Sequence, residues 1–93
     1  MFFFYILRCS DDTYYVGHTD DLVARLALHN SGFGANYTAA RRPVVLVHSE
    51  VFTTQEQALS RERQIKQWSG KKKAALIAGD LQALKALSKR RRR

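Results

Sequence analysis

The chain has 93 residues, of which 45% are hydrophobic, and carries a formal net charge of +8. This size and composition indicate one globular domain, and the lack of any run of about 18 apolar residues argues against a membrane-spanning helix. The single cysteine, Cys9, excludes an internal disulfide and favours a buried thiol in a reducing, cytoplasmic compartment.

The positive charge is concentrated in the second part of the chain. Residues 1–56 hold four basic and six acidic side chains, whereas residues 57–93 hold twelve basic and two acidic ones. A basic segment of this kind indicates a polyanionic partner, with nucleic acid the first candidate. The alternative is that residues 71–73 and 89–93 only form a solvated helix face and tail.

Residues 2–17, FFFYILRCSDDTYYVG, predict a β-hairpin. The first arm, residues 2–9, is apolar and largely aromatic apart from Arg8, which is typical of a strand buried on both faces. Residues 10–12, Ser-Asp-Asp, supply the turn because their side chains can bond nearby backbone amides. The second arm is residues 13–17.

The length of the turn decides where the tyrosines of this hairpin point. A three-residue loop pairs Leu7 with Tyr15 and Tyr5 with Gly17, which places both tyrosines on one face of the sheet. A two-residue loop places them on opposite faces. The sequence leaves both registers open, and it also leaves open whether these tyrosines only fill the core.

A helix is predicted over about residues 21–30, with Thr19 or Asp20 as its N-cap. Its end is predicted at Gly32 or Gly34, since either glycine can adopt the left-handed conformation that terminates helices.

His29 lies on the inward stripe of this helix with Leu22 and Leu26, and Arg25 precedes it by one turn. A buried, hydrogen-bonded histidine without a functional role is one interpretation. The neighbouring arginine favours a small catalytic or phosphate-binding pair, because a guanidinium matches phosphate oxygens.

Residues 34–42 are predicted to form a polar loop, followed by a strand over residues 44–52. The loop contains Tyr37, Arg41 and Arg42, which could stack on a base and grip a nucleic-acid backbone. An ordinary solvated loop would have a similar composition.

The next helix is predicted from about Thr54 to Trp68 or Ser69. Thr53 and Glu56 have the spacing of a capping box, so Glu56 is interpreted as a structural cap.

Glu62 is the anomaly of this helix, because it falls in the middle of the apolar stripe formed by Ala58, Leu59 and Ile65. A carboxylate on an inward face is costly unless it is paired, hydrogen-bonded or bound to a metal. A buried salt bridge, for example with Arg25, and a functional role are both consistent with this placement.

The remaining residues predict a short basic helix over residues 71–78 and a last amphipathic segment over residues 80–87. The leucines of that segment are expected to pack against the domain. The domain is expected to span residues 1–88, with residues 89–93 forming a basic, disordered tail.

Several motifs in one order resemble the GIY-YIG nuclease domain, over roughly residues 2–77. They are Phe4-Tyr5-Ile6, Tyr15-Val16-Gly17, Arg25, His29 and Glu62. The strings Gly34-Ala35-Asn36-Tyr37-Thr38 and Arg41-Arg42-Pro43 resemble the small stand-alone GIY-YIG proteins of bacteria. Phe3 stands where the family's first glycine would be, and no counterpart of the asparagine that some members use is found after Glu62.

The resemblance implies an α+β fold, a three-stranded antiparallel sheet with helices packed around it. It also implies a metal-dependent endonuclease that uses Mg²⁺ or Mn²⁺ to hydrolyse phosphodiester bonds in DNA, including structure-specific or single-stranded substrates, with RNA as another partner. The alternative is a catalytically weak or inactive nucleic-acid-binding module on the same fold.

The resemblance also implies roles for five residues. Glu62 would be the metal ligand, and Arg25 would stabilise charge on the phosphate. Tyr5 and Tyr15 would position the attacking water, one of them as general base, and His29 would help to move the proton.

These five side chains are expected to converge on one cleft, flanked by the basic surface of residues 61–73. The residues expected to contact nucleic acid are Tyr37, Arg41, Arg42, Arg61, Lys66, Lys71, Lys72 and Lys73.

Overall fold

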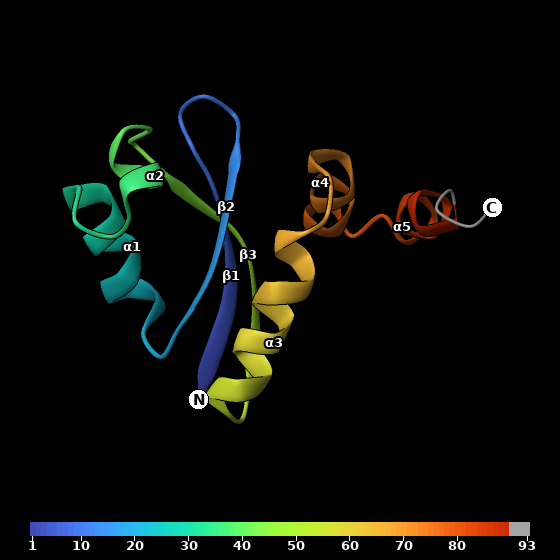
Figure 1. Ribbon diagram of the computed structural model, residues 1–93, viewed down its shortest axis with the longest axis horizontal. Coiled ribbons are helices and arrows are strands. Elements are labelled where there is room, and N and C mark those ends of the chain that lie inside the picture. Colours follow the sequence, from blue (N-terminus) through green and yellow to red (C-terminus); the bar gives the residue numbers. More distant parts are fainter. Residues whose placement is uncertain (90–93) are drawn as a thin grey trace.

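The computed structural model describes residues 1–89 of the chain, so the arginines at positions 90–93 lie outside the described part. The elements in order are β1 (Phe2–Arg8), β2 (Tyr14–Thr19), α1 (Leu22–Ser31), α2 (Asn36–Ala39), β3 (Val45–Phe52), α3 (Gln55–Lys66), α4 (Gly70–Ala78) and α5 (Leu81–Lys89). The strands form one antiparallel sheet with helices on both faces (Figure 1), which confirms the predicted α+β fold.

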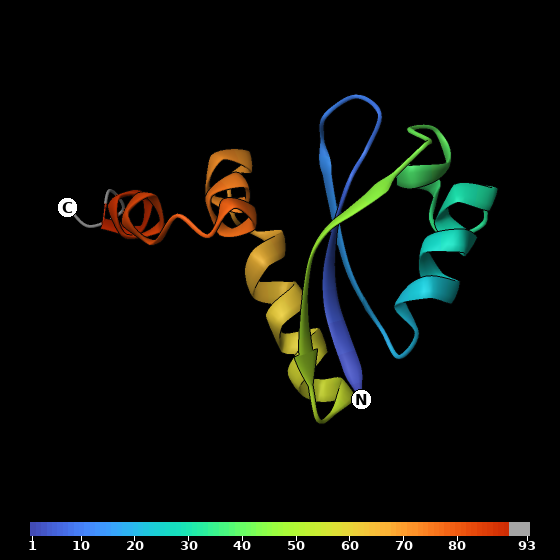
Figure 2. The same cartoon turned by 180° about the vertical axis from the view of Figure 1, so that it is seen from behind.

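The strand order is β2-β1-β3, so β1 lies in the middle of the sheet and is buried on both faces, as its apolar sequence predicts. Phe4 and Ile6 pack towards α3 and α4, in a core that includes Ile65. Tyr5 and Leu7 point to the opposite face, where α1 covers them. Figures 1 and 2 show the sheet between these two groups of helices.

The hairpin has the three-residue loop. Tyr5 pairs with Gly17 and Leu7 with Tyr15, so both tyrosines face α1. The turn ends at Asp12, whose φ of 66° is left-handed. A three-residue hairpin loop commonly needs this conformation at its last position, and Asp tolerates it better than most residues other than glycine.

The predicted first helix is present, but its cap is neither Thr19 nor Asp20. Asp21 is the N-cap, and its side chain accepts a hydrogen bond from the Ala24 backbone amide. The helix ends at Gly32, which has a φ of 95°.

Part of the predicted loop over residues 34–42 is helical, since α2 lies within it. The Ala39 amide and the Thr38 hydroxyl both donate to the Ala35 carbonyl, and Thr38 is fully buried. The structured part is a single turn, which is too short to leave a periodic pattern in the sequence.

The capping box of α3 starts one residue later than predicted, at Thr54. The Thr54 hydroxyl accepts from the Gln57 amide, while the Gln57 side chain accepts from the Thr54 amide. Glu56 is therefore not the reciprocal cap. The helix also ends earlier than predicted, at Lys66, because Ser69 caps a separate helix α4 by accepting from the Lys72 amide.

The leucines of α5, which are expected to pack against the domain, do so only in part: Leu84 and Leu87 are half-buried. The main contacts of α5 are with α4 (Figure 1). Leu81 is 71% exposed. The helix includes Lys89, so the expected tail over residues 89–93 otherwise lies outside the described residues. Across residues 1–89, every helix is too short or too polar to traverse a lipid bilayer.

Candidate functional site

A chain of buried hydrogen bonds links β1, α1 and α2. The Tyr5 hydroxyl lies 2.9 Å from His29 Nε2, and His29 Nδ1 lies 2.8 Å from the Thr38 hydroxyl. All three residues are at most 2% exposed. Every buried polar side-chain atom among the described residues has a hydrogen-bond partner, so none of the three side chains is left with an unsatisfied polar atom.

The hydrogen bonds identify the tautomer of His29. The Thr38 hydroxyl donates its proton to the Ala35 carbonyl, so its oxygen must accept from His29 Nδ1–H. His29 Nε2 then carries the lone pair and accepts from the Tyr5 hydroxyl. Burial lowers the pKa of His29, and Arg25 lowers it further, so the neutral imidazole is favoured.

Tyr15 and Arg25 lie beside the hydrogen-bonded pair of Tyr5 and His29. The Tyr15 ring centroid is 5.1 Å from that of His29, and Arg25 lines a narrow crevice with Tyr5. Burial raises the pKa of Tyr5 to about 12, Tyr15 adds to this effect, and Arg25 opposes it. A free Tyr5 phenolate is therefore disfavoured near neutral pH.

Two glycines let the backbone approach these rings. A Cβ at Gly17 would lie 2.5 Å from Tyr5 Oη, and a Cβ at Gly34 would collide with the His29 ring. Gly34 is therefore required by a close approach rather than as the left-handed end of α1.

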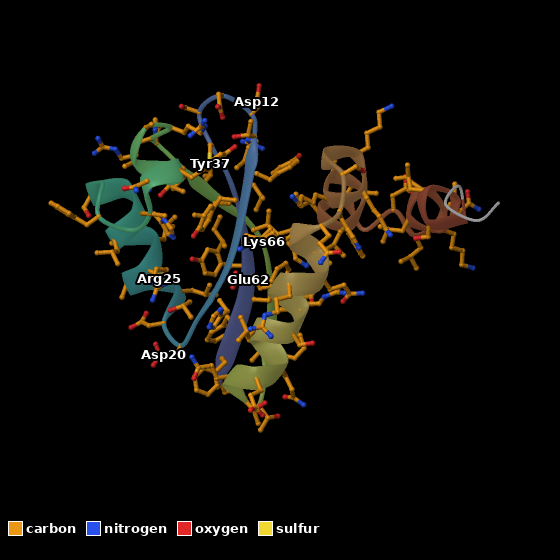
Figure 3. All side chains as sticks on the ribbon, in the orientation of Figure 1. Asp12, Asp20, Arg25, Tyr37, Glu62 and Lys66 are labelled. Carbon is orange, nitrogen blue, oxygen red and sulfur yellow. The ribbon has the colours of Figure 1, made fainter. Side chains whose placement is uncertain are left out.

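Glu62 approaches the edge strand β2 from the other face of the sheet. Its Oε1 lies 2.6 Å from His18 Nδ1 and its Oε2 lies 3.2 Å from Lys66 Nζ, so its partner is not Arg25. Figure 3 shows the reason, since Arg25 comes from the α1 side of β2 and Glu62 from the α3 side. The carboxylate is 14% exposed, which agrees with its place on the inward stripe.

The carboxylate of Glu62 fits a metal site in which the protein supplies a single carboxylate ligand. In the described part of the chain, no group of three or more His, Cys, Asp or Glu side chains could hold an ion. One oxygen of Glu62 is anchored by His18, and the other contacts the Lys66 side chain, which is 62% exposed and free to move away. This donor set suits a hard cation that takes a single carboxylate and fills its remaining positions with water and phosphate oxygens.

Three of the expected nucleic-acid contacts surround a hollow of about 240 Å³ next to β2. Tyr37 lines it from α2, Lys66 from α3 and Lys73 from α4. Tyr15 forms part of the same wall, which joins this hollow to the tyrosine–histidine pair.

The other expected contacts lie elsewhere or are engaged. Arg61 donates to Glu50 on β3, the opposite edge of the sheet from β2. Arg42 donates to the Ala39 carbonyl, and Lys72 lies over the Trp68 ring. Lys71 is exposed.

Arg41 is engaged as well. It pairs with Asp11 in the hairpin turn and lies over the Tyr37 ring, 3.8 Å from its centroid.

Two residues of this region carry no sequence signal of their own. His18 follows the Tyr15-Val16-Gly17 motif and bonds Glu62, and Thr38 orients His29. The alternation of β2 would have placed His18 on the face opposite Tyr15. Its partner, however, is 44 positions away, and only the packing of α3 identifies it.

The chain resembles known proteins over most of its length. The family model described as the GIY-YIG catalytic domain matches residues 1–75. A UPF0213 protein of Bacillus pumilus is 51% identical over 75 residues, which cover 81% of this chain and 76% of that protein. One from Halobacterium salinarum is 49% identical over 73 residues, covering 78% of this chain and 95% of that protein.

Two solved structures are also similar. The solution NMR structure of a UPF0213 protein from Bacillus halodurans has a TM-score of 0.55 and 38% identity, and covers 86% of each chain. That of a protein from E. faecalis has a TM-score of 0.57 and 40% identity, and covers 83% of this chain and 82% of that one. The chain therefore belongs to the GIY-YIG nuclease family, and its relatives include small UPF0213 proteins.

Proposed function

We propose that this protein is a divalent-metal-dependent endonuclease that hydrolyses phosphodiester bonds in DNA. The observation that carries the proposal is the buried Tyr5–His29–Thr38 chain on one side of β2, with the carboxylate of Glu62 on the other side. Family membership supports a nuclease, and the net charge of +8 supports a nucleic-acid substrate.

The tyrosine–histidine pair offers a route for the proton of the attacking water. Tyr5 donates its own proton to His29 Nε2 as its oxygen accepts one from water, so a free phenolate never accumulates. This route accommodates the pKa of Tyr5, which burial raises to about 12. His29 can take the proton because Thr38 holds it in the tautomer with a free Nε2.

Charge on the phosphate is countered by Arg25 and by the cation. The Arg25 guanidinium is suited to the oxygens of the phosphoryl group in the transition state, where negative charge builds up. Glu62 would hold Mg²⁺ or Mn²⁺, which when bound supplies positive charge and polarises the phosphoryl oxygens. His18 anchors one oxygen of the Glu62 carboxylate, and the other oxygen, which contacts the exposed Lys66, would turn to the ion.

Cleavage assays with Glu62→Ala and Glu56→Ala test the proposal. Supercoiled and branched DNA are incubated with Mg²⁺ or Mn²⁺ beside an EDTA control. We expect Glu62→Ala to lower the cleavage rate at least about 100-fold, because several kcal/mol of charge stabilisation is lost with the ion. Glu56 is exposed on the first turn of the same helix, so Glu56→Ala should cut like the wild type. Cutting that survives in Glu62→Ala or in EDTA would refute the metal-dependent mechanism.

A binding module with little or no catalysis is the second candidate. It is favoured by the engagement of both Glu62 oxygens, with His18 and Lys66. DNA binding that weakens as salt rises, with no metal-dependent cutting of any substrate, would establish this alternative.

A further inference from the structure

The hollow beside β2 combines aromatic walls with positive charge. Its volume is about 240 Å³, and it is lined by Tyr14, Tyr15, Val16, Tyr37, Lys66 and Lys73. This is smaller than the roughly 300–1,000 Å³ of pockets that bind drug-sized ligands. Its size therefore suits one planar base better than a base pair.

The aromatic wall is held in place before any ligand arrives. The rings of Tyr15 and Tyr37 are stacked, with centroids 6.1 Å apart and planes 25° apart. Arg41 lies over Tyr37, donates to the Tyr37 carbonyl and is paired with Asp11. Arg41 thus positions the Tyr37 ring, and its charge is partly neutralised, so it is less suited to gripping a phosphate itself.

The opposite wall carries two ammonium groups. Lys66 is the exposed partner of Glu62, and among the described residues Lys73 has no ion pair. Burial lowers the pKa of Lys73, and Lys66 lowers it further. An anion between these side chains would relieve the repulsion, and a nucleotide carries such an anion next to its base.

The hollow also adjoins the candidate catalytic residues. Tyr15 lines it and packs edge-on against His29. Figure 3 shows Tyr37 and Lys66 on either side of β2, above Arg25 and Glu62. A nucleotide held in the hollow would therefore lie next to the tyrosine–histidine pair.

We propose that this hollow binds one unpaired nucleotide of DNA, with its base on Tyr15 and Tyr37 and its phosphate at Lys66 and Lys73. The substrate is then single-stranded or frayed at this position, because a paired base would first have to leave its stack at a cost of a few kcal/mol. The inference rests on the proposed function in one respect, namely that the bound polymer is DNA. Binding and cutting can nevertheless be measured separately.

Binding in EDTA, where no cutting is expected, tests the inference. Fluorescence anisotropy compares a single-stranded oligonucleotide with its duplex, and a 2-aminopurine base in the single strand reports stacking through a fall in its fluorescence. We expect the wild type to bind the single strand at least about 10-fold more tightly than the duplex. Tyr37→Ala should weaken single-strand binding about 5- to 150-fold, the range of one stacked base, and should abolish the fall in fluorescence.

Two matched variants make the test specific. Tyr37→Phe keeps the ring and should bind like the wild type, and Phe33→Ala removes an aromatic side chain that is 82% exposed outside the hollow and should also have no effect. Lys73→Gln provides a test independent of the aromatic wall and should reduce the salt dependence of single-strand binding.

Equal affinity for both DNA forms, or equal effects of Tyr37→Ala and Phe33→Ala, would overturn the inference. If Tyr37→Ala does not fold, unchanged salt dependence in Lys73→Gln would overturn it instead. Cutting of DNA without selective single-strand binding would refute only this subsite. Selective binding without any cutting would refute only the nuclease.

Discussion

At the scale of single residues, the candidate site depends on how closely β2 approaches the Tyr5 ring. A Cβ on Gly17 would lie 2.5 Å from Tyr5 Oη and 2.7 Å from Cζ. Tyr5 is 2% exposed and bonded to His29, so it has little room to move. The glycine of the Tyr15-Val16-Gly17 motif is thus explained by the space that Tyr5 occupies, and not by an unusual φ.

Gly17→Ala should therefore both destabilise the fold and disturb the site. We expect a loss of about 1–3 kcal/mol, the usual cost of an added methyl group in a packed interior, measured by urea unfolding. Gly70→Ala is the matched control, since Gly70 is the first residue of α4 and a Cβ there meets nothing within 4 Å. An equal effect of the two substitutions would show that Tyr5 is not confined as described.

At the scale of elements, the spacing of residues along α3 determines which of its side chains face the sheet. Ala58, Glu62 and Ile65 share the inner face, whichever threonine caps the helix. Glu62 reaches His18 of β2 from that face. The capping box of Thr54 and Gln57 determines where the helix begins.

Thr54→Ala and Thr53→Ala distinguish the observed capping box from the predicted one. Thr54→Ala removes the hydroxyl that accepts from the Gln57 amide, and we expect it to cost about 0.5–2 kcal/mol. Thr53→Ala should have little effect on stability, since Thr53 is exposed and lies outside the box. Thermal unfolding followed by circular dichroism measures both, and a larger loss in Thr53→Ala would contradict the observed cap.

At the scale of the whole molecule, the sheet separates the two halves of the candidate site. Tyr5, His29 and Arg25 lie on the α1 face, and Glu62 lies on the α3 face. The edge strand β2 lies between the two halves: its His18 bonds Glu62, and its Gly17 lies against the Tyr5 ring. The helix α5 projects beyond this assembly and packs mainly on α4 (Figure 2).

A chain ending after Asp80 should keep the fold and lose part of its affinity for DNA. The deletion removes few contacts with the sheet, so we expect Tm to change by less than about 8 °C, which corresponds to about 1 kcal/mol in a domain of this size. It also removes six basic side chains and no acidic ones, so the salt dependence of DNA binding should become less steep.

A chain with Arg90–Arg93 replaced by serine controls for charge alone in that experiment. It keeps α5 but lacks four of the six removed charges. If the truncated chain melts far lower than this control, α5 contributes to the core more than its contacts indicate.

Local patterns were sufficient for much of the fold. The apolar run of β1 predicts a strand buried on both faces, and a carboxylate on the apolar stripe of α3 marks Glu62. The pattern placed the capping box one residue too early, at Thr53, because Thr53 and Thr54 have the same chemistry. It also missed α2, whose single turn depends on the buried Thr38.

The amino-acid order alone was enough to indicate the strands, the main helices and the signature residues, because each depends on neighbours a few positions away. Packing was needed for three further features: the loop register that brings Tyr5 and Tyr15 onto one face, the pairing of Glu62 with His18, and the position of Arg61 against β3. Those contacts join residues distant in the chain, and their partners become neighbours only when helices from both faces close over one narrow sheet.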